Sequence, residues 1–370
     1  MIDLDPALSK GPWFSYGQFT YGGDPHFFLT GRPIPGSLQI TKTSSGVTTP
    51  LTTYTLAQDQ KAATLTSPLP ASGDIITVRM LSFRRTRSAV RYLNHLYVSD
   101  LVSNLLVAYS LGRVVRGYAG NAVQISRSGD GATSDFGFVG DGFDWGGAVA
   151  WVIAGGGTQN GYITKWYDQG GTTNDFIQPT SNRPLLITSG VANNEITFNS
   201  STHDYLPSTS GVSVSNTALT IFTRQRGATT GADPTYHVGI DAGFNGSVTT
   251  GFAHYYVVSA SKFRTFLGHN GSSGYAGNDW SYTPTALGTL TFLFDTTQGA
   301  AVDQVKAWWN GTALTPTPSF SSLQSGNIAN TTRVLGGNGS SYTSDMAYTS
   351  YIECAGDQTA NRAAVEALLY

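Results

Sequence analysis

The chain has 370 residues, of which 40% are hydrophobic, 12% aromatic and 12% charged, and its formal net charge is −2 at pH 7. This apolar content excludes a wholly disordered chain, and the near-neutral charge excludes the basic surface with which proteins bind nucleic acid. At about two and a half times the common domain size, the length predicts two domains or one large all-β domain.

Small uncharged polar residues take the place of charged ones. Charged residues reach only about half of the roughly 25% found in an average globular protein, and the only glutamates are Glu195, Glu353 and Glu366. Threonine, serine, asparagine and glycine suit strand faces and tight turns. The composition therefore predicts an all-β protein.

The cysteine content limits how the chain can be stabilised, and the length of the apolar runs limits whether it can cross a membrane. The single Cys354 cannot form an intrachain disulfide, so we expect stability from burial or oligomerisation. The longest apolar runs, such as LLVAY at residues 105–109, are too short to cross a bilayer, so we expect no membrane insertion. The first residues, MIDLDPALSKGPW, lack the apolar segment of a signal peptide.

Residues 1–91 show the pattern of a small β-sandwich or barrel. Short β-prone runs alternate with turn segments such as GRPIPG and SPLPASGD, in which proline and glycine favour chain reversal. The expected strands are residues 14–21, 26–30, 37–41, 52–56, 62–66 and 74–81. The last of these carries apolar side chains on both faces, which is typical of a central strand.

The segment YTLAQDQKAATLTSPLPASGDIITVRMLSFRRT, residues 54–86, resembles the N-terminal domains of bacteriophage tail fibres and related virion adaptors. In these domains a strand, a turn with proline and glycine and a strand ending in arginines precede a helical connector. The resemblance implies that residues 1–91 anchor the protein to a virion. It also implies a homotrimer, because a symmetric interface stabilises such assemblies without disulfides.

Two helices are expected. Residues 92–111 read as a helical connector, with Ser99 as the N-cap, Asp100 in the first turn and apolar residues at helical spacing as far as Leu111. A short helix over residues 360–369 closes the chain.

Residues 112–370 are predicted to form strands separated by glycine-rich turns. The expected strands are residues 161–167, 195–198, 219–224, 252–259, 262–268, 287–295, 304–309 and 345–353. No helix pattern is evident between them, which excludes βαβ units and a dinucleotide-binding fold. An antiparallel jelly roll of two sheets is the natural arrangement.

Four motifs occur in order in AYSLGRVVRGYAGNAVQISRSGDGATSDFGF (residues 108–138) and GYITKWYDQGGTTNDFIQPTSNRPLL (residues 161–186). Their residues are Gly117, Tyr118 and Gly120; Arg127 and Asp130; Ala132, Thr133 and Asp135; and Trp166, Tyr167, Asp168 and Gln169. They resemble the arabinofuranosidase B catalytic-domain family. The later segments VKAWWNGTAL (residues 305–314) and 336–370 resemble the end of a concanavalin A-like, laminin G-like jelly roll. We expect Asp168 to bond backbone amides beneath a loop.

The residues that the family's chemistry requires are not evident. A retaining glycosidase needs two carboxyl groups about 5 Å apart, and the family nucleophile is a glutamate preceded by adjacent cysteines. The matching stretch TYHVGIDAGFNGS has only Asp241 as a carboxylate and no cysteine. We therefore expect that the protein is not an enzyme. The alternative is an arabinofuranosidase-like glycoside hydrolase acting on surface polysaccharide through Asp241, with Asp279 or Asp295 as the acid.

Aromatic and amide side chains crowd into residues 255–282, as in sites where aromatic faces pack on sugars and amides bind hydroxyls. The candidate carbohydrate-binding residues are Tyr255, His269, Asn270, Tyr275, Asn278, Asp279, Trp280 and Tyr282. Packing of the aromatic residues in the core or at a subunit interface is the alternative.

Asp130, Asp135, Asp141 and Asp144 alternate with glycines, as in oxygen-rich calcium loops, although the same residues form ordinary tight turns. Calcium is the one candidate cofactor.

These observations predict an all-β structural protein of a tailed bacteriophage virion: a tail fibre or spike, an adaptor or a capsid decoration. Its domains are an anchoring domain (1–91), a helical connector (92–111) and a concanavalin A-like jelly roll (112–370). The expected partners are two further copies of the chain, other virion proteins and host surface polysaccharide, which the lectin-like jelly roll would bind.

Overall fold

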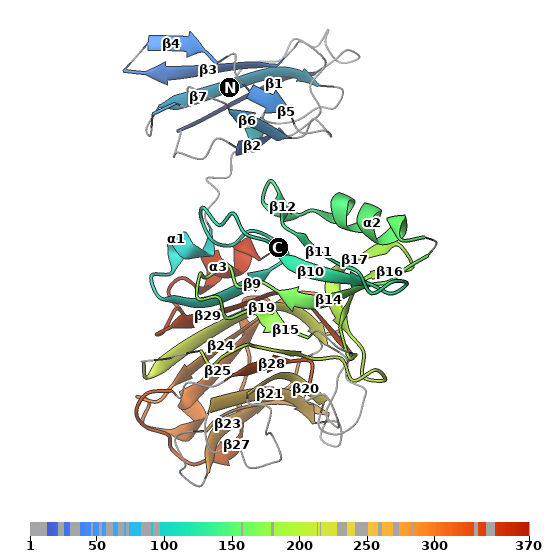
Figure 1. The fold of residues 1–370 in the computed structure, drawn as a ribbon. Coiled ribbons are helices and arrows are strands. Elements are labelled where there is room, and N and C mark those ends of the chain that lie inside the picture. Colours follow the sequence, from blue (N-terminus) through green and yellow to red (C-terminus); the bar gives the residue numbers. More distant parts are fainter. Residues whose placement is uncertain are drawn as a thin grey trace. The chain divides into compact units, whose positions relative to one another are not determined.

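The structure is a computed structural model. It describes residues 13–20, 26–29, 38–45, 47–51, 54–56, 62–65, 70–71, 74–82, 90–91, 97–156, 158–178, 181–212, 214, 216–227, 235–240, 251–257, 261–268, 274–282, 284–328, 332–337 and 345–369. The chain forms two compact units, Met1–Leu96 and Tyr97–Tyr370 (Figure 1).

The first unit contains two four-stranded antiparallel sheets, ordered β1-β7-β3-β4 and β5-β6-β2-β8. Its strands are β1 (Trp13–Thr20), β2 (His26–Leu29), β3 (Gln39–Ser44), β4 (Val47–Pro50), β5 (Tyr54–Leu56), β6 (Ala62–Leu65), β7 (Ile75–Ser82) and β8 (Val90–Arg91). Strand β7 pairs with β1 on one side and β3 on the other, so the predicted central strand is confirmed.

The second unit is built on a twelve-stranded sheet with the order β11-β10-β14-β16-β17-β29-β19-β24-β25-β26, in which β15 joins β14 and β9 joins β29. Its strands are β9 (Leu105–Ser110), β10 (Val123–Arg127), β11 (Thr133–Phe136), β14 (Gly161–Trp166), β15 (Phe176–Ile177), β16 (Leu185–Thr188), β17 (Val191–Phe198), β19 (Ala218–Gly227), β24 (Gly288–Asp295), β25 (Val305–Trp309), β26 (Thr312–Ala313) and β29 (Met346–Ala355).

A seven-stranded sheet, ordered β18-β28-β20-β21-β22-β23-β27, forms the second layer. Its strands are β18 (Leu206–Pro207), β20 (Thr235–Ile240), β21 (Gly251–Val257), β22 (Lys262–Gly268), β23 (Tyr275–Trp280), β27 (Thr317–Ser321) and β28 (Arg333–Leu335). The remaining elements are the ribbon β12 (Phe138–Val139) with β13 (Gly142–Phe143), and the helices α1 (Val98–Leu101), α2 (Trp145–Ala154), η3 (Ala301–Gln304) and α3 (Arg362–Leu368). The paired strands are antiparallel, and the predicted all-β jelly roll is confirmed.

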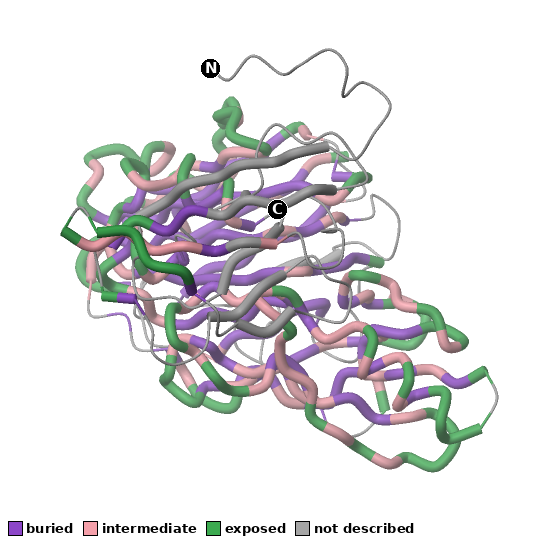
Figure 2. The backbone as a smooth tube through the Cα atoms, turned by 90° about the horizontal axis from the view of Figure 1, so that it is seen from above, coloured by how far each residue is buried: buried purple, intermediate pink, exposed green. Residues whose placement is uncertain are grey.

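The main core lies between the two large sheets. Ile221 of β19 and Phe292 of β24 pack in the same apolar cluster as Phe252 and Phe263 of the facing sheet. The opposite face of the larger sheet is also buried, because Phe222 packs in a second cluster with residues of α1 and α3. Figure 2 shows buried residues along the strands and exposed ones at the turns. The central strands are therefore apolar on both faces.

The predicted helix over residues 92–111 is wrong in its second half. Residues 92–96 lie outside the described residues, α1 is a single turn, and residues 105–110 form β9 beside β29. Val107 and Tyr109 enter the main core, whereas Ala108 enters the second cluster. A strand buried on both faces carries a continuous apolar run, which periodicity alone cannot distinguish from a helix.

Helix α2 was not predicted. It begins at Asp144, whose Oδ1 accepts a hydrogen bond from the backbone N–H of Gly147 at 2.9 Å, as an N-cap carboxylate does. Gly146 and Gly147 in its first turn weaken helix propensity, which hid the pattern. The closing helix was predicted and is confirmed as α3.

A buried ion pair joins the two sheets. Arg333, the first residue of β28, donates from Nε to Glu353 Oε1 at 2.6 Å and from Nη2 to Oε2 at 3.0 Å. Both side chains are fully buried. The Tyr351 hydroxyl also donates to Glu353, and the Arg333 guanidinium lies 4.8 Å from the centre of the Phe252 ring.

We predict that Glu353→Gln lowers the free energy of unfolding by about 3–5 kcal/mol, because it leaves the Arg333 charge buried without its counterion. Arg116→Gln, which breaks the exposed pair with Asp100, should cost about 0–1 kcal/mol. Urea titrations of the two variants and the wild type measure both values. Equal losses of unfolding free energy in the two variants would show that the buried pair stabilises the fold no more than the exposed pair does.

We predict that the Cys354 thiol is unreactive in the folded protein. The side chain is fully buried, and burial, with a smaller contribution from Glu353, raises its pKa to about 12. A rise of three pKa units lowers the thiolate fraction at pH 8 about a thousandfold. A thiol reagent should therefore label the chain in guanidinium but not in buffer. Rapid stoichiometric labelling in buffer would contradict this.

Candidate functional site

The aromatic residues predicted to bind carbohydrate are divided between the two faces of the seven-stranded sheet. Trp280 is 1% exposed and donates from Nε1 to Thr265 Oγ1 at 3.0 Å, while the Tyr282 hydroxyl lies 3.0 Å from His254 Nε2. Both pack with the main core. Tyr255 and Tyr275 instead pack around Phe266 in a separate cluster on the opposite face. The structure therefore does not bring the four rings together.

The polar residues of the predicted site that the structure describes are hydrogen-bonded to other residues of the chain. Asp279 accepts two hydrogen bonds from the Arg264 guanidinium, at 2.6 and 3.0 Å. Asn278 is fully buried and donates from Nδ2 to the backbone oxygens of Val302 and Val305, each at 2.8 Å. His269 and Asn270 lie outside the described residues.

The predicted calcium ligands serve four separate local interactions. Asp130 pairs with Arg127 at 2.6 Å, and Asp135 accepts from the Tyr167 hydroxyl at 2.8 Å. Asp141 lies 3.8 Å from Arg113 and accepts from the Tyr97 hydroxyl at 3.0 Å. Asp144 caps α2. In the described part of the chain, no group of three His, Cys, Asp or Glu residues is placed to hold a metal ion.

Asp168 and Gln169 hold the free edge of β9, and the predicted structural role of Asp168 is confirmed. Asp168 Oδ1 accepts from the backbone N–H of Ala108 at 2.8 Å, and the backbone N–H of Gln169 donates to the Ala108 oxygen at 2.7 Å. Gln169 Nε2 also donates to the Ser110 oxygen at 3.0 Å. These hydrogen bonds occupy the edge of β9 at which a neighbouring strand would otherwise pair.

Asp241, Asp279 and Asp295 are the carboxyl groups that the sequence suggests for hydrolysis. Among the described residues they do not form a catalytic pair. Asp241 lies outside the described residues. Asp279 is occupied by Arg264. At Asp295, burial raises the pKa, but hydrogen bonds from Thr297 and Gln298 outweigh it, so that the pKa is lowered. A carboxyl group with a lowered pKa is a poor proton donor near neutral pH.

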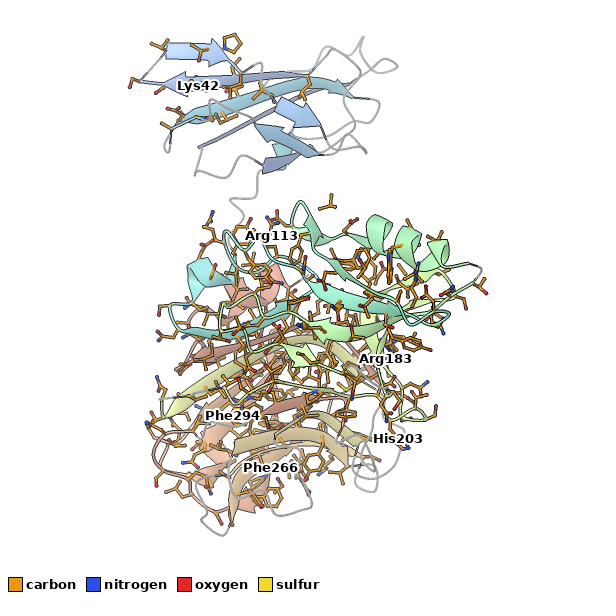
Figure 3. The ribbon with its side chains drawn as sticks, viewed as in Figure 1. Lys42, Arg113, Arg183, His203, Phe266 and Phe294 are labelled. Carbon is orange, nitrogen blue, oxygen red and sulfur yellow. The ribbon has the colours of Figure 1, made fainter. Side chains whose placement is uncertain are left out.

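The pKa of Asp204 is shifted in the opposite direction. It lies on the loop of residues 199–205 between β17 and β18, near His203, which is labelled in Figure 3. Its side chain is 3% exposed, and burial is the main cause that raises its pKa to about 6. Asp345 raises the pKa further, while hydrogen bonds from Thr202 and Asn199 lower it. Asp204 therefore has the pKa of a general acid.

Asp345 is anchored to the same loop, because its Oδ1 accepts from the backbone N–H of Ser200 at 2.8 Å. Asp204 itself accepts from the backbone N–H of Asn199 at 3.0 Å and from the Thr202 hydroxyl at 2.8 Å. Sequence analysis missed this pair, since 141 positions separate the two residues and no motif marks either. Burial of one carboxyl group beside the other is a tertiary property.

None of the helices in the part of the chain that the structure describes is long and apolar enough to cross a membrane.

Comparison with known proteins finds the fold among carbohydrate enzymes. An arabinofuranosidase complexed with arabinofuranosyl-α-1,2-xylobiose has a TM-score of 0.54 at 14% identity, covering 75% of this chain and 64% of that chain. A mutant GH54 α-L-arabinofuranosidase soaked with 4-nitrophenyl α-L-arabinofuranoside has a TM-score of 0.50 at 13% identity, covering 72% and 62%. No protein-family model and no curated protein matches the chain.

A weaker match is the receptor-binding domain of a botulinum neurotoxin C/D mosaic serotype, with a TM-score of 0.39 at 11% identity over 55% of this chain and 48% of that chain. At that TM-score the likeness supports no argument. The chain spans less than two thirds of the length of the two arabinofuranosidases. The likenesses to the two arabinofuranosidases establish a shared fold, in agreement with the resemblance of residues 112–370.

The comparisons correct one expectation. We expected a protein that is not an enzyme, but two solved structures that share its fold at a TM-score of 0.5 or more are arabinofuranosidases studied with sugar ligands. The expectation that the protein is not an enzyme is therefore withdrawn. Neither of these matches is a tail fibre, and the virion expectation gains no support from them.

Proposed function

We propose that the second unit is a carbohydrate-active domain that hydrolyses glycosidic bonds. The observation that carries the proposal is the likeness, at a TM-score of 0.54, to an arabinofuranosidase that holds an arabinofuranosylated xylobiose. Arabinofuranosides are accordingly the first substrate class to test. Because fold and activity separate readily, the residues that carry the chemistry have to be argued from the site itself.

Asp204 is the proposed general acid. Glycoside hydrolysis uses one protonated carboxyl group, which protonates the leaving oxygen, and one ionised carboxylate on the other side of the bond. Two carboxyl groups whose surroundings separate their pKa values are the signature of such a pair. Burial raises the pKa of Asp204, as a general acid requires. Asp345, an exposed residue directly before β29 that is hydrogen-bonded to this loop through Ser200, is the proposed second carboxylate.

The narrower virion proposal rests on sequence alone. The resemblance of residues 54–86 to tail-fibre domains supports an anchoring role for the first unit, and with it a homotrimer, virion protein partners and a location on the particle. Attachment to a host polysaccharide is compatible with a hydrolytic second unit. Calcium binding and carbohydrate binding by residues 255–282 are likewise proposed from the sequence alone.

We predict that the full chain releases 4-nitrophenol from 4-nitrophenyl α-L-arabinofuranoside. Asp204→Asn and Asp345→Asn should each lower kcat/KM by about 10²–10⁴, the usual loss for an acid–base group. Asp303→Asn, at an exposed position in η3, is the matched control and should retain activity. Hydrolysis that survives in both Asp204 and Asp345 variants would refute the assigned pair. No release from any arabinofuranoside would refute the hydrolase.

The pH dependence of activity follows from the raised pKa of Asp204. A general acid must be protonated, so kcat/KM should fall as the pH rises above about 6, the pKa of this carboxyl group. Initial rates between pH 4 and pH 8 would show this alkaline limb. An activity that instead rises through pH 6 and stays constant would exclude Asp204 as the acid.

Folding stability gives a second test of the same pKa. The folded chain holds the Asp204 proton up to about pH 6, whereas the unfolded chain releases it near 3.8. Between these values the folded state binds more protons, so stability falls as the pH rises. Relative to Asp204→Asn, the wild type should lose unfolding free energy from pH 4 to pH 7. A constant difference between the two would contradict the raised pKa.

A further inference from the structure

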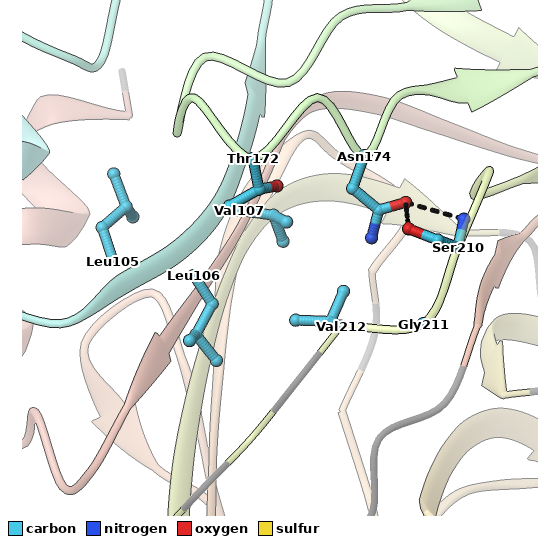
Figure 4. Close-up of a pocket in the computed structure, with 8 residues that line it drawn as sticks. All are labelled: Leu105, Leu106, Val107, Thr172, Asn174, Ser210, Gly211 and Val212. Atoms are coloured by element: carbon cyan, nitrogen blue, oxygen red, sulfur yellow. Dashed lines mark hydrogen bonds between the residues drawn. The ribbon is translucent and has the colours of Figure 1, made fainter.

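A pocket of about 250 Å³ lies beside β9, between the β14–β15 loop and the segment after β18 (Figure 4). It is lined by Leu105, Leu106, Val107, Thr172, Asn174, Ser210, Gly211 and Val212. Pockets for drug-sized ligands measure roughly 300–1,000 Å³. This pocket therefore suits a single small group rather than a long chain.

The floor of the pocket is apolar and firmly held. Val107 and Val212 are 0% and 4% exposed and belong to the main core, and Leu106 packs against the same core. Side chains fixed in this way form the pocket before any ligand arrives, which lowers the entropic cost of binding. Thr172 and Ser210 are exposed and mark its mouth. A ligand can thus enter from solvent and place an apolar group on the floor.

One buried amide group supplies a hydrogen-bond donor. Asn174 is 3% exposed, and its Oδ1 accepts from the backbone N–H and the hydroxyl of Ser210 at 2.9 and 3.1 Å, and from the Thr209 hydroxyl at 3.2 Å. These bonds fix the orientation of the amide. Figure 4 shows Nδ2 on the side of Val212, where it can donate to a ligand in the pocket. A ligand with an acceptor would complement it.

The mouth supplies the complementary acceptor. The Thr172 hydroxyl donates to Asp168 Oδ2 at 2.5 Å, which leaves its lone pairs as acceptors. In Figure 4 this oxygen lies on the side that faces Asn174. The pocket thus combines an aliphatic floor, one N–H donor and one hydroxyl acceptor, and no lining residue carries a charge.

We propose that this pocket binds the N-acetyl group of an acetamido sugar. The methyl group would pack on Leu106, Val107 and Val212, the carbonyl oxygen would accept from Asn174 Nδ2, and the amide N–H would donate to Thr172 Oγ1. An unsubstituted sugar ring would set hydroxyl groups against the aliphatic floor without partners, which is costly. The inference rests on the proposed function, since it names a sugar class for the same domain.

Ligand-observed NMR on the full chain tests the inference directly. The probes are methyl N-acetyl-β-D-glucosaminide, methyl N-acetyl-β-D-galactosaminide, methyl β-D-glucoside and a 6-O-acetylated glucoside. Saturation transfer should be strongest at the acetyl methyl of the acetamido sugars and absent from the plain glucoside. The ester lacks the N–H and should bind more weakly than the acetamido sugars. No saturation of the acetamido methyl groups would overturn the proposal.

Two variants locate the binding. Asn174→Asp keeps an oxygen for Ser210 but replaces the donor with an acceptor, and should weaken acetamido-sugar binding at least about tenfold. Asn104→Asp is the matched control, because it adds the same charge at an exposed position next to Leu105 and should change affinity within about twofold. If Asn174→Asp fails to fold, Thr172→Val tests the mouth and should remove the preference for amide over ester. Unchanged binding in these pocket variants would overturn the assignment.

The same proteins separate this inference from the proposed function. Acetamido binding that depends on Asn174, without release of sugar from arabinofuranosides, would support the pocket and refute the hydrolase. Hydrolysis that depends on Asp204, without acetamido binding, would support the hydrolase and refute the pocket.

Discussion

The contact between Arg333 and Glu353 is the constraint on which the two-layered unit depends. The arginine comes from the seven-stranded sheet and the glutamate from the twelve-stranded sheet, and neither side chain reaches solvent. A charge taken out of water is tolerated only with a well-aligned partner. We infer that the pair fixes how the two sheets face each other, because any sliding of one sheet over the other would strand both charges.

The strand that carries Glu353 also borders the segments that hold the two candidate sites. Strand β29, which carries Glu353, is bordered by β19 along one edge and by β17 and β9 in turn along the other. The loop of residues 199–205 follows β17, and the apolar pocket lies against β9. Both candidate sites therefore sit on segments attached to one central strand. In such folds functional residues commonly lie on loops that rigid strands hold in place.

The aromatic segment shows where reasoning from sequence fails at the site. Successive side chains of a strand point to opposite faces, so residues that are close in sequence can end up on different sides of a sheet. Tyr255 packs with Phe266, whereas its neighbour Tyr256 packs in the main core. Counting aromatic residues along the chain cannot assign these faces unless the packing of the second sheet is known. The same holds for Asp204, whose pKa depends on burial and on the distant Asp345.

The sequence by itself determined the fold class and most of the strands, because strand propensity, turn residues and the scarcity of charge are local properties. It also identified the structural role of Asp168, whose bonds to the backbone amides of Gly170 and Thr172 are local in sequence. Only the tertiary structure decided that residues 105–110 form a strand, that Arg333 meets Glu353, and that Asn174 is held beside an aliphatic floor. Each of these depends on contacts between segments far apart in the chain, and no local pattern encodes such contacts.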